Sequence, residues 1–130
     1  MNDTLKTIQD RVSLRKYADR DIKEEHLEII LDGAMKAPTA GNQMLYSIIL
    51  IKDQETKDAL SKSCDDQPFI ATAPLLMLFV ADHQKWFDYY MKNNVKEFTE
   101  KIGIKFEAPQ ESDLFLACED AMIAAQNAVI

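Results

Sequence analysis

Two arginines and a serine at alternate positions, Arg11, Ser13 and Arg15, are the residue types best suited to binding an anion. In extended backbone, successive side chains point to opposite faces. These three side chains would then share one face, while Val12 and Leu14 anchor the other face in a core. Each guanidinium offers a fixed fork of N–H donors that matches the oxygens of a phosphate. We therefore expect an extended phosphate-binding segment; the alternative is a surface strand with two solvated arginines.

The composition is that of one soluble globular domain, which we expect to cover residues 1–130, with 47% hydrophobic and 28% charged residues. The net charge of −7 argues against binding nucleic acid or an anionic membrane surface. The longest apolar stretch, residues 69–81, is too short to span a bilayer. Against this acidic background, residues 11–20 contain four of the 15 Lys and Arg residues.

The two cysteines, Cys64 and Cys118, are too few for a disulfide framework or a zinc site, so we expect no metal centre. The first residues, Met-Asn-Asp-Thr, are polar and lack the apolar core of a secretion signal. These features indicate a reduced, cytoplasmic protein.

The hydrophobic pattern alternates between helical and strand-like segments. In the range 23–36, apolar residues recur at i, i+3, i+4 and i+7, which predicts an amphipathic helix that ends before Pro38. Runs of Ile, Leu and Val predict buried strands. The pattern predicts helices over 4–10, 23–36, 54–63 and 84–101, and strands over 47–52 and 75–81.

The last segment, from about Ser112, is apolar on almost every side. A helix that is hydrophobic all round is buried, either in a domain centre or against a second subunit. The chain ends at Ile130 without Gly, Pro or a polar cap. We therefore expect these residues to be the N-terminal portion of a longer protein.

Four motifs in order resemble the flavin-dependent nitroreductase family. They are Arg-Val-Ser-Leu-Arg-Lys-Tyr at 11–17, Ala-Pro-Thr-Ala-Gly-Asn-Gln at 37–43, Gln-Pro-Phe-Ile-Ala-Thr-Ala-Pro at 67–74, and Asp-Ala-Met-Ile-Ala-Ala-Gln-Asn-Ala-Val at 120–129. The resemblance implies an α+β fold with a mostly antiparallel sheet flanked by helices. It also implies an intertwined homodimer with FMN at the interface.

The same resemblance implies roles for residues at the first and third motifs. Arg11 and Ser13 would meet the ribityl phosphate, and Arg15 would reach the pyrimidine edge of the flavin ring. A cation at that edge is physically reasonable, because reduced flavin carries negative charge there. Gln67 falls near the position at which relatives place an amide against the pyrimidine.

The second motif would lie against the flavin of the opposite subunit, through Pro38, Thr39, Ala40 and Asn42. The alternative is an ordinary loop that joins a helix to a strand, with Pro, Gly and Asn present for turn chemistry. Just beyond, Met44-Leu45-Tyr46 replaces the Gln-Pro-Trp of many relatives, and because that segment helps to shape the site, the resemblance implies no detailed substrate pocket.

The four aromatic residues between Trp86 and Tyr90 occupy a region where relatives vary and often form a lid over the substrate. Aromatic side chains at helical spacing are more often core or dimer contacts, so this group is left outside the expected site.

As implied by the resemblance, the reaction passes hydride from NAD(P)H through flavin N5 to an electron-poor acceptor such as a nitroaromatic or a quinone. The flavin carries this chemistry, so no catalytic side chain is expected. The alternatives are other flavin chemistry, such as reductive dehalogenation or flavin destruction, and a non-catalytic FMN-binding or dimerisation module.

Overall fold

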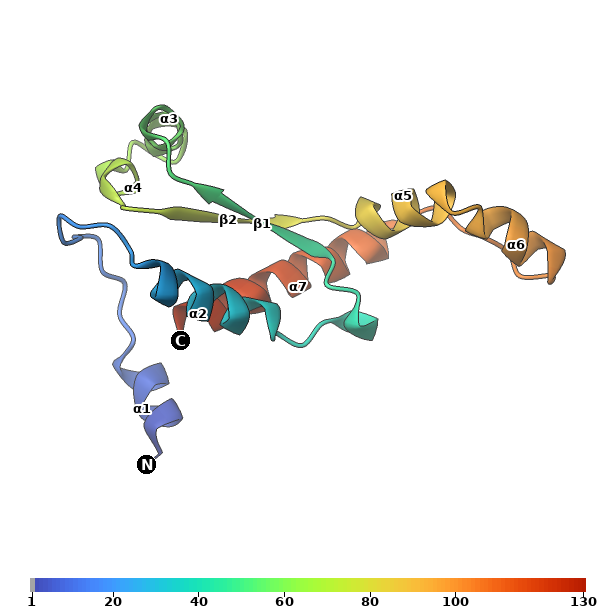
Figure 1. The fold of residues 1–130 in the computed structure, drawn as a ribbon, viewed down its shortest axis with the longest axis horizontal. Helices are drawn as coiled ribbons and strands as arrows, with labels where there is room; N and C mark the ends of the chain where they lie inside the picture. Colours follow the sequence, from blue (N-terminus) through green and yellow to red (C-terminus); the bar gives the residue numbers. More distant parts are fainter. Residues whose placement is uncertain (1) are drawn as a thin grey trace.

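The computed structural model describes residues 2–130 as a helical layer on one small sheet, with an arm of two helices that extends away from it (Figure 1). In this range no helix is long and apolar enough to cross a membrane. The elements in order are α1 (Asp3–Asp10), α2 (Glu24–Met35), the 3-10 turn η1 (Ala40–Asn42), β1 (Tyr46–Ile51), α3 (Gln54–Ser63), α4 (Pro68–Thr72), β2 (Leu76–Ala81), α5 (Gln84–Lys92), α6 (Val95–Lys101) and α7 (Glu111–Val129).

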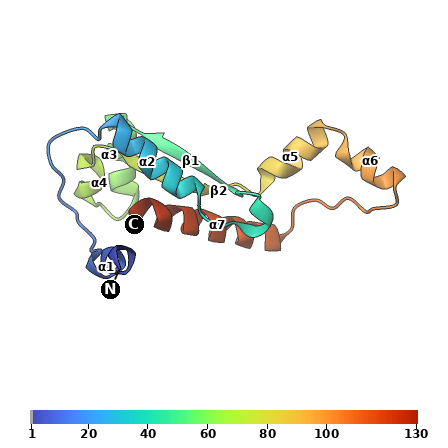
Figure 2. The same ribbon diagram turned by 60° about the horizontal axis from the view of Figure 1, so that its bottom comes forward.

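The sheet is an antiparallel pair of β1 and β2, in register from Tyr46 opposite Ala81 to Ile51 opposite Leu76. Because side chains alternate along a strand, one face carries Tyr46, with Ile48 and Phe79 packed beside it, toward α7. The opposite face carries Ile49 and Leu78, which are directly paired and about half exposed. Helix α7 lies against both the sheet and α2 (Figure 2).

Small residues let α7 approach its neighbours closely. Ala117, Ala121 and Ala124 are buried on one side of the helix, against the sheet and α2. The other side is exposed, with Phe115 at 66% and Met122 at 71%. Burial all round within a domain centre is therefore wrong for this chain, and the expected contact with a second subunit stays a prediction.

The predicted helices over 23–36 and 54–63 and both predicted strands are confirmed to within one or two residues. The helix predicted over 84–101 is wrong in one respect: it is broken into α5 and α6. Asn94 adopts a left-handed conformation, with φ of 54°, that a continuing right-handed helix does not allow. Helix α4 was not expected from the sequence pattern.

The extended strand predicted for residues 11–15 is not present. Val12 is 66% and Leu14 74% exposed, so the prediction that they anchor a core is wrong. The physical reason is that β1 and β2 pair only with each other in the described chain, and no backbone hydrogen bond there ties residues 12–19 to either strand. The segment runs irregularly from α1 to α2 (Figure 1).

Candidate functional site

The arginine segment lies beside helix α4. The guanidinium carbon of Arg15 is 5.3 Å from the centroid of the Phe69 ring in α4, which is a cation–π contact. Gln67 is the N-cap residue of the same helix. The fold therefore brings Arg15 and the start of α4 together, although more than fifty residues separate them in sequence.

The guanidiniums of this segment are free to bind a ligand. Within residues 2–130, neither Arg11 nor Arg15 has a carboxylate oxygen within 4.0 Å, although Asp10 and Asp19 are close in sequence. Both arginines and Ser13 are exposed. Exposed guanidiniums and a hydroxyl without an anionic partner are a donor set that fits a phosphate group. No hydrogen bond or ion pair in the described chain joins Arg11 or Ser13 to α4.

Gln67 is held at the turn between α3 and α4. Its backbone N–H donates to the Ser61 carbonyl at 2.9 Å, and the Ser61 hydroxyl donates to the Gln67 carbonyl at 2.8 Å. The side-chain nitrogen donates to the Cys64 carbonyl at 2.7 Å. The carboxamide oxygen has no partner among the described residues, so it is the atom available to accept a hydrogen bond from a ligand.

The loop after α2 contains Pro38, Thr39, Ala40 and Asn42, and it is held by a residue that the sequence analysis missed. Asp120 of α7 is 2% exposed, and its two carboxylate oxygens accept the N–H groups of Ala40 at 3.2 Å and Leu45 at 3.1 Å. The sequence of α7 contains a signal for this role. Position 120 is the one polar member of the otherwise alanine-only buried face of α7.

Tyr46 lies directly after this loop, at the start of β1. Its hydroxyl donates to the Ala34 carbonyl at 3.3 Å. Burial raises the pKa of Tyr46 above its ordinary value, and the negative charge of Asp120 adds to the effect. The Lys85 ammonium donates to the Tyr46 carbonyl at 3.0 Å, which ties the start of the arm to the same strand end.

The two groups of expected site residues lie at opposite ends of α2. The arginine segment and α4 lie beyond the start of this helix, and the loop 38–42 follows its end (Figures 1 and 2). Helix α2 has 12 residues, which corresponds to a length of about 18 Å. A single chain therefore does not bring both groups into one site.

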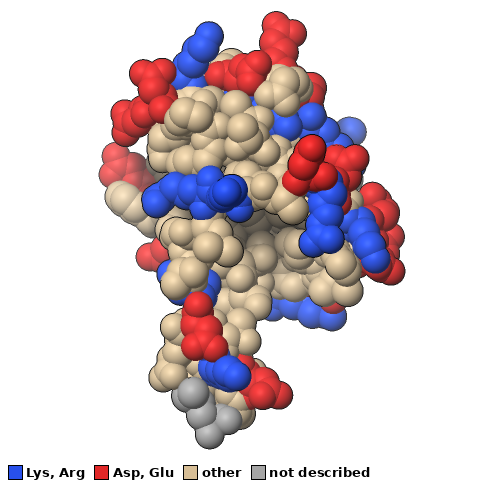
Figure 3. All heavy atoms as spheres, turned by 90° about the vertical axis from the view of Figure 1, so that its left-hand side faces the viewer, with Lys and Arg blue, Asp and Glu red and all other residues tan. Residues whose placement is uncertain are grey.

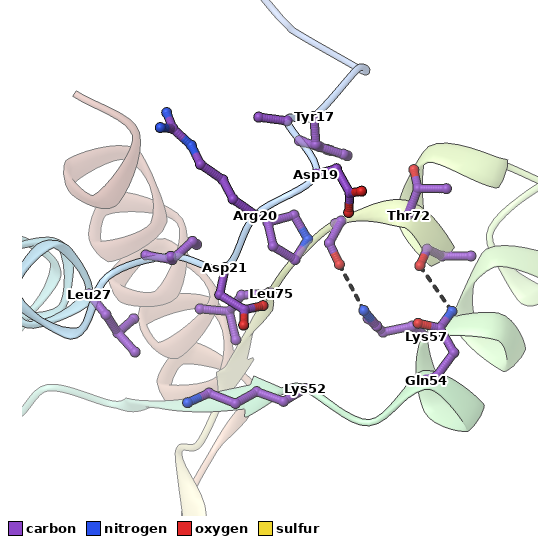
Figure 4. A pocket seen from close by; sticks show the side chains of 15 residues that line it. Tyr17, Asp19, Arg20, Asp21, Leu27, Lys52, Gln54, Lys57, Thr72 and Leu75 are labelled. Atoms are coloured by element: carbon purple, nitrogen blue, oxygen red, sulfur yellow. Dashed lines mark hydrogen bonds between the residues drawn. The ribbon is translucent and has the colours of Figure 1, made fainter.

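A cavity of about 850 Å³ lies next to the arginine segment and is lined by residues 17–22, 71–75, Leu27, Lys52, Gln54 and Lys57. Figure 3 shows a hollow on this side of the molecule with Lys and Arg side chains around it. The charged groups do not converge. Lys57 donates to the Ala73 carbonyl at 2.9 Å, while the Arg20 guanidinium points away from Lys57 (Figure 4). The cavity is therefore the weaker candidate for a phosphate site.

Three of the four aromatic residues of α5, Trp86, Phe87 and Tyr90, line a second cavity of about 370 Å³ at the base of the arm. The Trp86 indole N–H donates to the Gln43 carbonyl at 2.7 Å, and the rings of Phe87 and Phe106 stack at 5.8 Å. None of the α5 residues is buried, so a core role for the group is wrong. A dimer contact through these rings stays a prediction.

Titratable side chains offer no metal centre in the part of the chain that the structure describes, because no group of three or more His, Cys, Asp or Glu lies close enough together. Cys64 and Cys118 are both free and exposed.

Comparison of this chain with known sequences finds a family match and similar proteins. The model of the nitroreductase family matches residues 8–130. The FMN reductase (NADPH) of Bacillus subtilis is 30% identical over 128 residues, which is 98% of this chain and 48% of that protein. The FMN reductase [NAD(P)H] of the same organism is 33% identical over 85 residues, 65% of this chain and 34% of that protein. The chain thus spans between a third and a half of these relatives.

Solved structures agree with the sequence relatives. NfrA2 of B. megaterium has a TM-score of 0.79 at 30% identity, over 99% of this chain and 49% of that one. Nitroreductase A of Vibrio parahaemolyticus has a TM-score of 0.81 at 26% identity, over 98% of this chain and 49% of that one. The expected α+β fold is confirmed, and the chain belongs to the nitroreductase family.

Proposed function

We propose that this protein is part of an FMN-dependent oxidoreductase that uses NAD(P)H to reduce an electron-poor acceptor such as a nitroaromatic or a quinone. The observation that carries the proposal is the exposed arginine segment, which has no carboxylate partner among residues 2–130 and contacts α4 through Arg15. It occurs in a chain of the nitroreductase family, two relatives of which are named FMN reductases.

Residues of this chain would bind the cofactor from two directions. Arg11 and Ser13 would hold the phosphate, because charged donors bind phosphate oxygens more strongly than neutral ones do. Arg15 and the free carboxamide oxygen of Gln67 would face the pyrimidine edge. The bound flavin would supply hydride transfer, while Arg15 would place positive charge where the reduced ring is negative.

The loop residues Pro38, Thr39, Ala40 and Asn42 would contact the flavin held by a second copy of the chain. The separation of this loop from the arginine segment by the length of α2 supports that arrangement, since one chain does not place both at one ligand. A homodimer with FMN at the interface would allow the arginine segment of one copy and the loop of the other copy to contact the same flavin.

The test is a titration of the purified protein with FMN, followed by flavin fluorescence and visible absorbance, and then by anaerobic addition of NADH or NADPH. We expect FMN to bind, to bleach on addition of a nicotinamide, and to recover when a quinone is added. FMN that binds but is never bleached would overturn the oxidoreductase and leave a flavin-binding module. Fluorescence that stays that of free FMN would overturn the flavin site itself.

A further inference from the structure

Asp120 is a buried charge with an unusual set of partners. In the described chain no Lys, Arg or His lies within 4.0 Å of its carboxylate. A buried charge is tolerated only when hydrogen bonds replace its water shell. Here the partners are the backbone N–H groups of Ala40 and Leu45, one on each oxygen. A side chain on α7 therefore grips the loop 40–45 at both of its ends.

The backbone of this loop adopts conformations that most residues avoid. Gly41, Asn42 and Met44 all have φ between 51° and 59°, in the left-handed region. Residues other than glycine rarely adopt this region, and such conformations persist where the surroundings impose them. The Thr39 hydroxyl also accepts the Met44 N–H at 3.2 Å, so a second bond restrains the same loop from within.

We propose that Asp120 is a positioning residue, which fixes the loop 40–45 in the shape that meets the flavin held by a second subunit. The second half of this statement rests on the proposed function; the grip on the loop does not. A carboxylate suits the task because both of its oxygens accept, whereas an amide of the same shape accepts at one atom and donates at the other.

The packing of α7 around Asp120 is as important to this role as the carboxylate. Asp120 belongs to the buried face of α7, between Ala117 and Ala124, both of which are fully enclosed. A side chain on a packed helix has few alternative positions, so Asp120 ties both ends of the loop to a rigid element, helix α7. Loss of the grip would leave the loop only part of the time in its competent shape, and apparent affinity falls by that fraction.

The test compares Asp120→Asn with two matched variants on the same helix. Asn127→Ala removes another bond of α7, from the Asn127 side-chain nitrogen to the Gly33 carbonyl at 3.1 Å in α2, and leaves the loop alone. Glu119→Gln neutralises an exposed neighbour. Hydrogen exchange of the Ala40 and Leu45 amides reports the grip without any flavin, and FMN titration reports its consequence.

In the unaltered protein we expect both amides to be protected from exchange. In Asp120→Asn at least one of them should exchange about tenfold faster, and FMN should bind about tenfold more weakly. Asn127→Ala should lower the melting temperature with FMN affinity within about twofold of normal. Glu119→Gln should leave the exchange rates of the Ala40 and Leu45 amides unchanged.

Each half of the proposal fails separately. Free-peptide exchange rates at Ala40 and Leu45 in the unaltered protein would overturn the grip, and this measurement needs no variant to fold. Faster exchange in Asp120→Asn with unchanged FMN affinity would overturn the positioning role. An equal loss of FMN affinity in Asn127→Ala would reduce Asp120 to a general stabilising contact. An unaltered protein that binds no FMN would instead overturn the proposed function.

Discussion

Arg15 offers the sharpest test at the scale of one residue. The change Arg15→Ala should weaken FMN binding by about 1.5–3 kcal/mol, the range for a hydrogen bond to a charged group. The measurement is FMN fluorescence quenching on titration. Lys96→Ala is the control, because Lys96 is also an exposed cation but lies on the arm in α6, far from α4 (Figure 1). An equal loss in both variants would mean that only the overall charge of the protein matters.

Tyr46 links the stability of the fold to pH. Its folded pKa is raised, by burial first and by Asp120 second, above the unfolded value of about 10. The neutral phenol is thus favoured in the folded state. This contribution is fully present below pH of about 10 and is lost as the pH rises through the folded pKa.

The measurement for Tyr46 is the free energy of unfolding between neutral and alkaline pH, compared with Tyr46→Phe. The variant should be less stable at neutral pH, because it lacks the hydroxyl that donates to Ala34, and its curve should fall less steeply in alkali. Parallel curves for the two proteins would contradict a raised pKa at this position.

Among the elements, those with a clear hydrophobic period could be predicted from the sequence. The i, i+3, i+4, i+7 spacing located α2, and the Ile and Leu run located β1. Periodicity did not reveal the break at Asn94, because the aromatic and apolar residues of α5 and α6 continue one helical pattern across it. The break depends on a single left-handed residue, and asparagine also occurs within helices.

The strand predicted over residues 11–15 from the alternation of side chains is wrong, because a strand also needs a neighbouring strand to pair with. The described chain gives this segment no neighbouring strand, so Val12 and Leu14 are exposed. The chemistry of the site was easier to predict from the sequence than its geometry, because the residue types that bind anions could be recognised directly. The role of Asp120 could not, because it depends on contacts across 75 and 80 positions of sequence. Only its place on a buried helix face was available beforehand.

Two glycines in different elements should respond to alanine in opposite directions. A Cβ at Gly33 in α2 would lie 3.7 Å from the Asn127 carbonyl oxygen, which is ordinary contact. Gly33→Ala should therefore stabilise the protein, by up to about 1 kcal/mol of helix propensity. Gly41 has φ of 59°, so Gly41→Ala should destabilise it by about 1–2 kcal/mol.

Urea unfolding of the two glycine variants beside the unaltered protein checks both signs. A destabilising Gly33→Ala would mean that α2 and α7 do not tolerate even a methyl group between them. A neutral Gly41→Ala would mean that the loop is not held in the left-handed conformation, which would also weaken the case for a grip by Asp120.

On the scale of the whole molecule, the chain leaves large apolar side chains exposed on several elements, and those of α7 and of the outer face of the sheet lie on the central body of the fold. The exposed large apolar residues of α7 are Leu114, Phe115, Met122, Ile123 and Val129. Ile49 and Leu78 add a paired apolar couple on the sheet. Exposed apolar side chains gathered on one helix favour a protein contact there, which suits the second copy that the candidate flavin site needs.

Met122→Glu tests this assembly without disturbing the fold. Met122 is 71% exposed, and Glu has nearly the helix propensity of Met, so the single chain should remain folded. If α7 forms the interface, an unpaired carboxylate is buried there, and the dimer should be weakened by about 3–5 kcal/mol. Sedimentation velocity measures the dimer, with Phe98→Glu on the exposed arm helix α6 as the control. FMN affinity should fall as the dimer dissociates, because each flavin would lose the loop 38–42 of the other copy. A Met122→Glu protein that stays dimeric would show that the interface lies elsewhere.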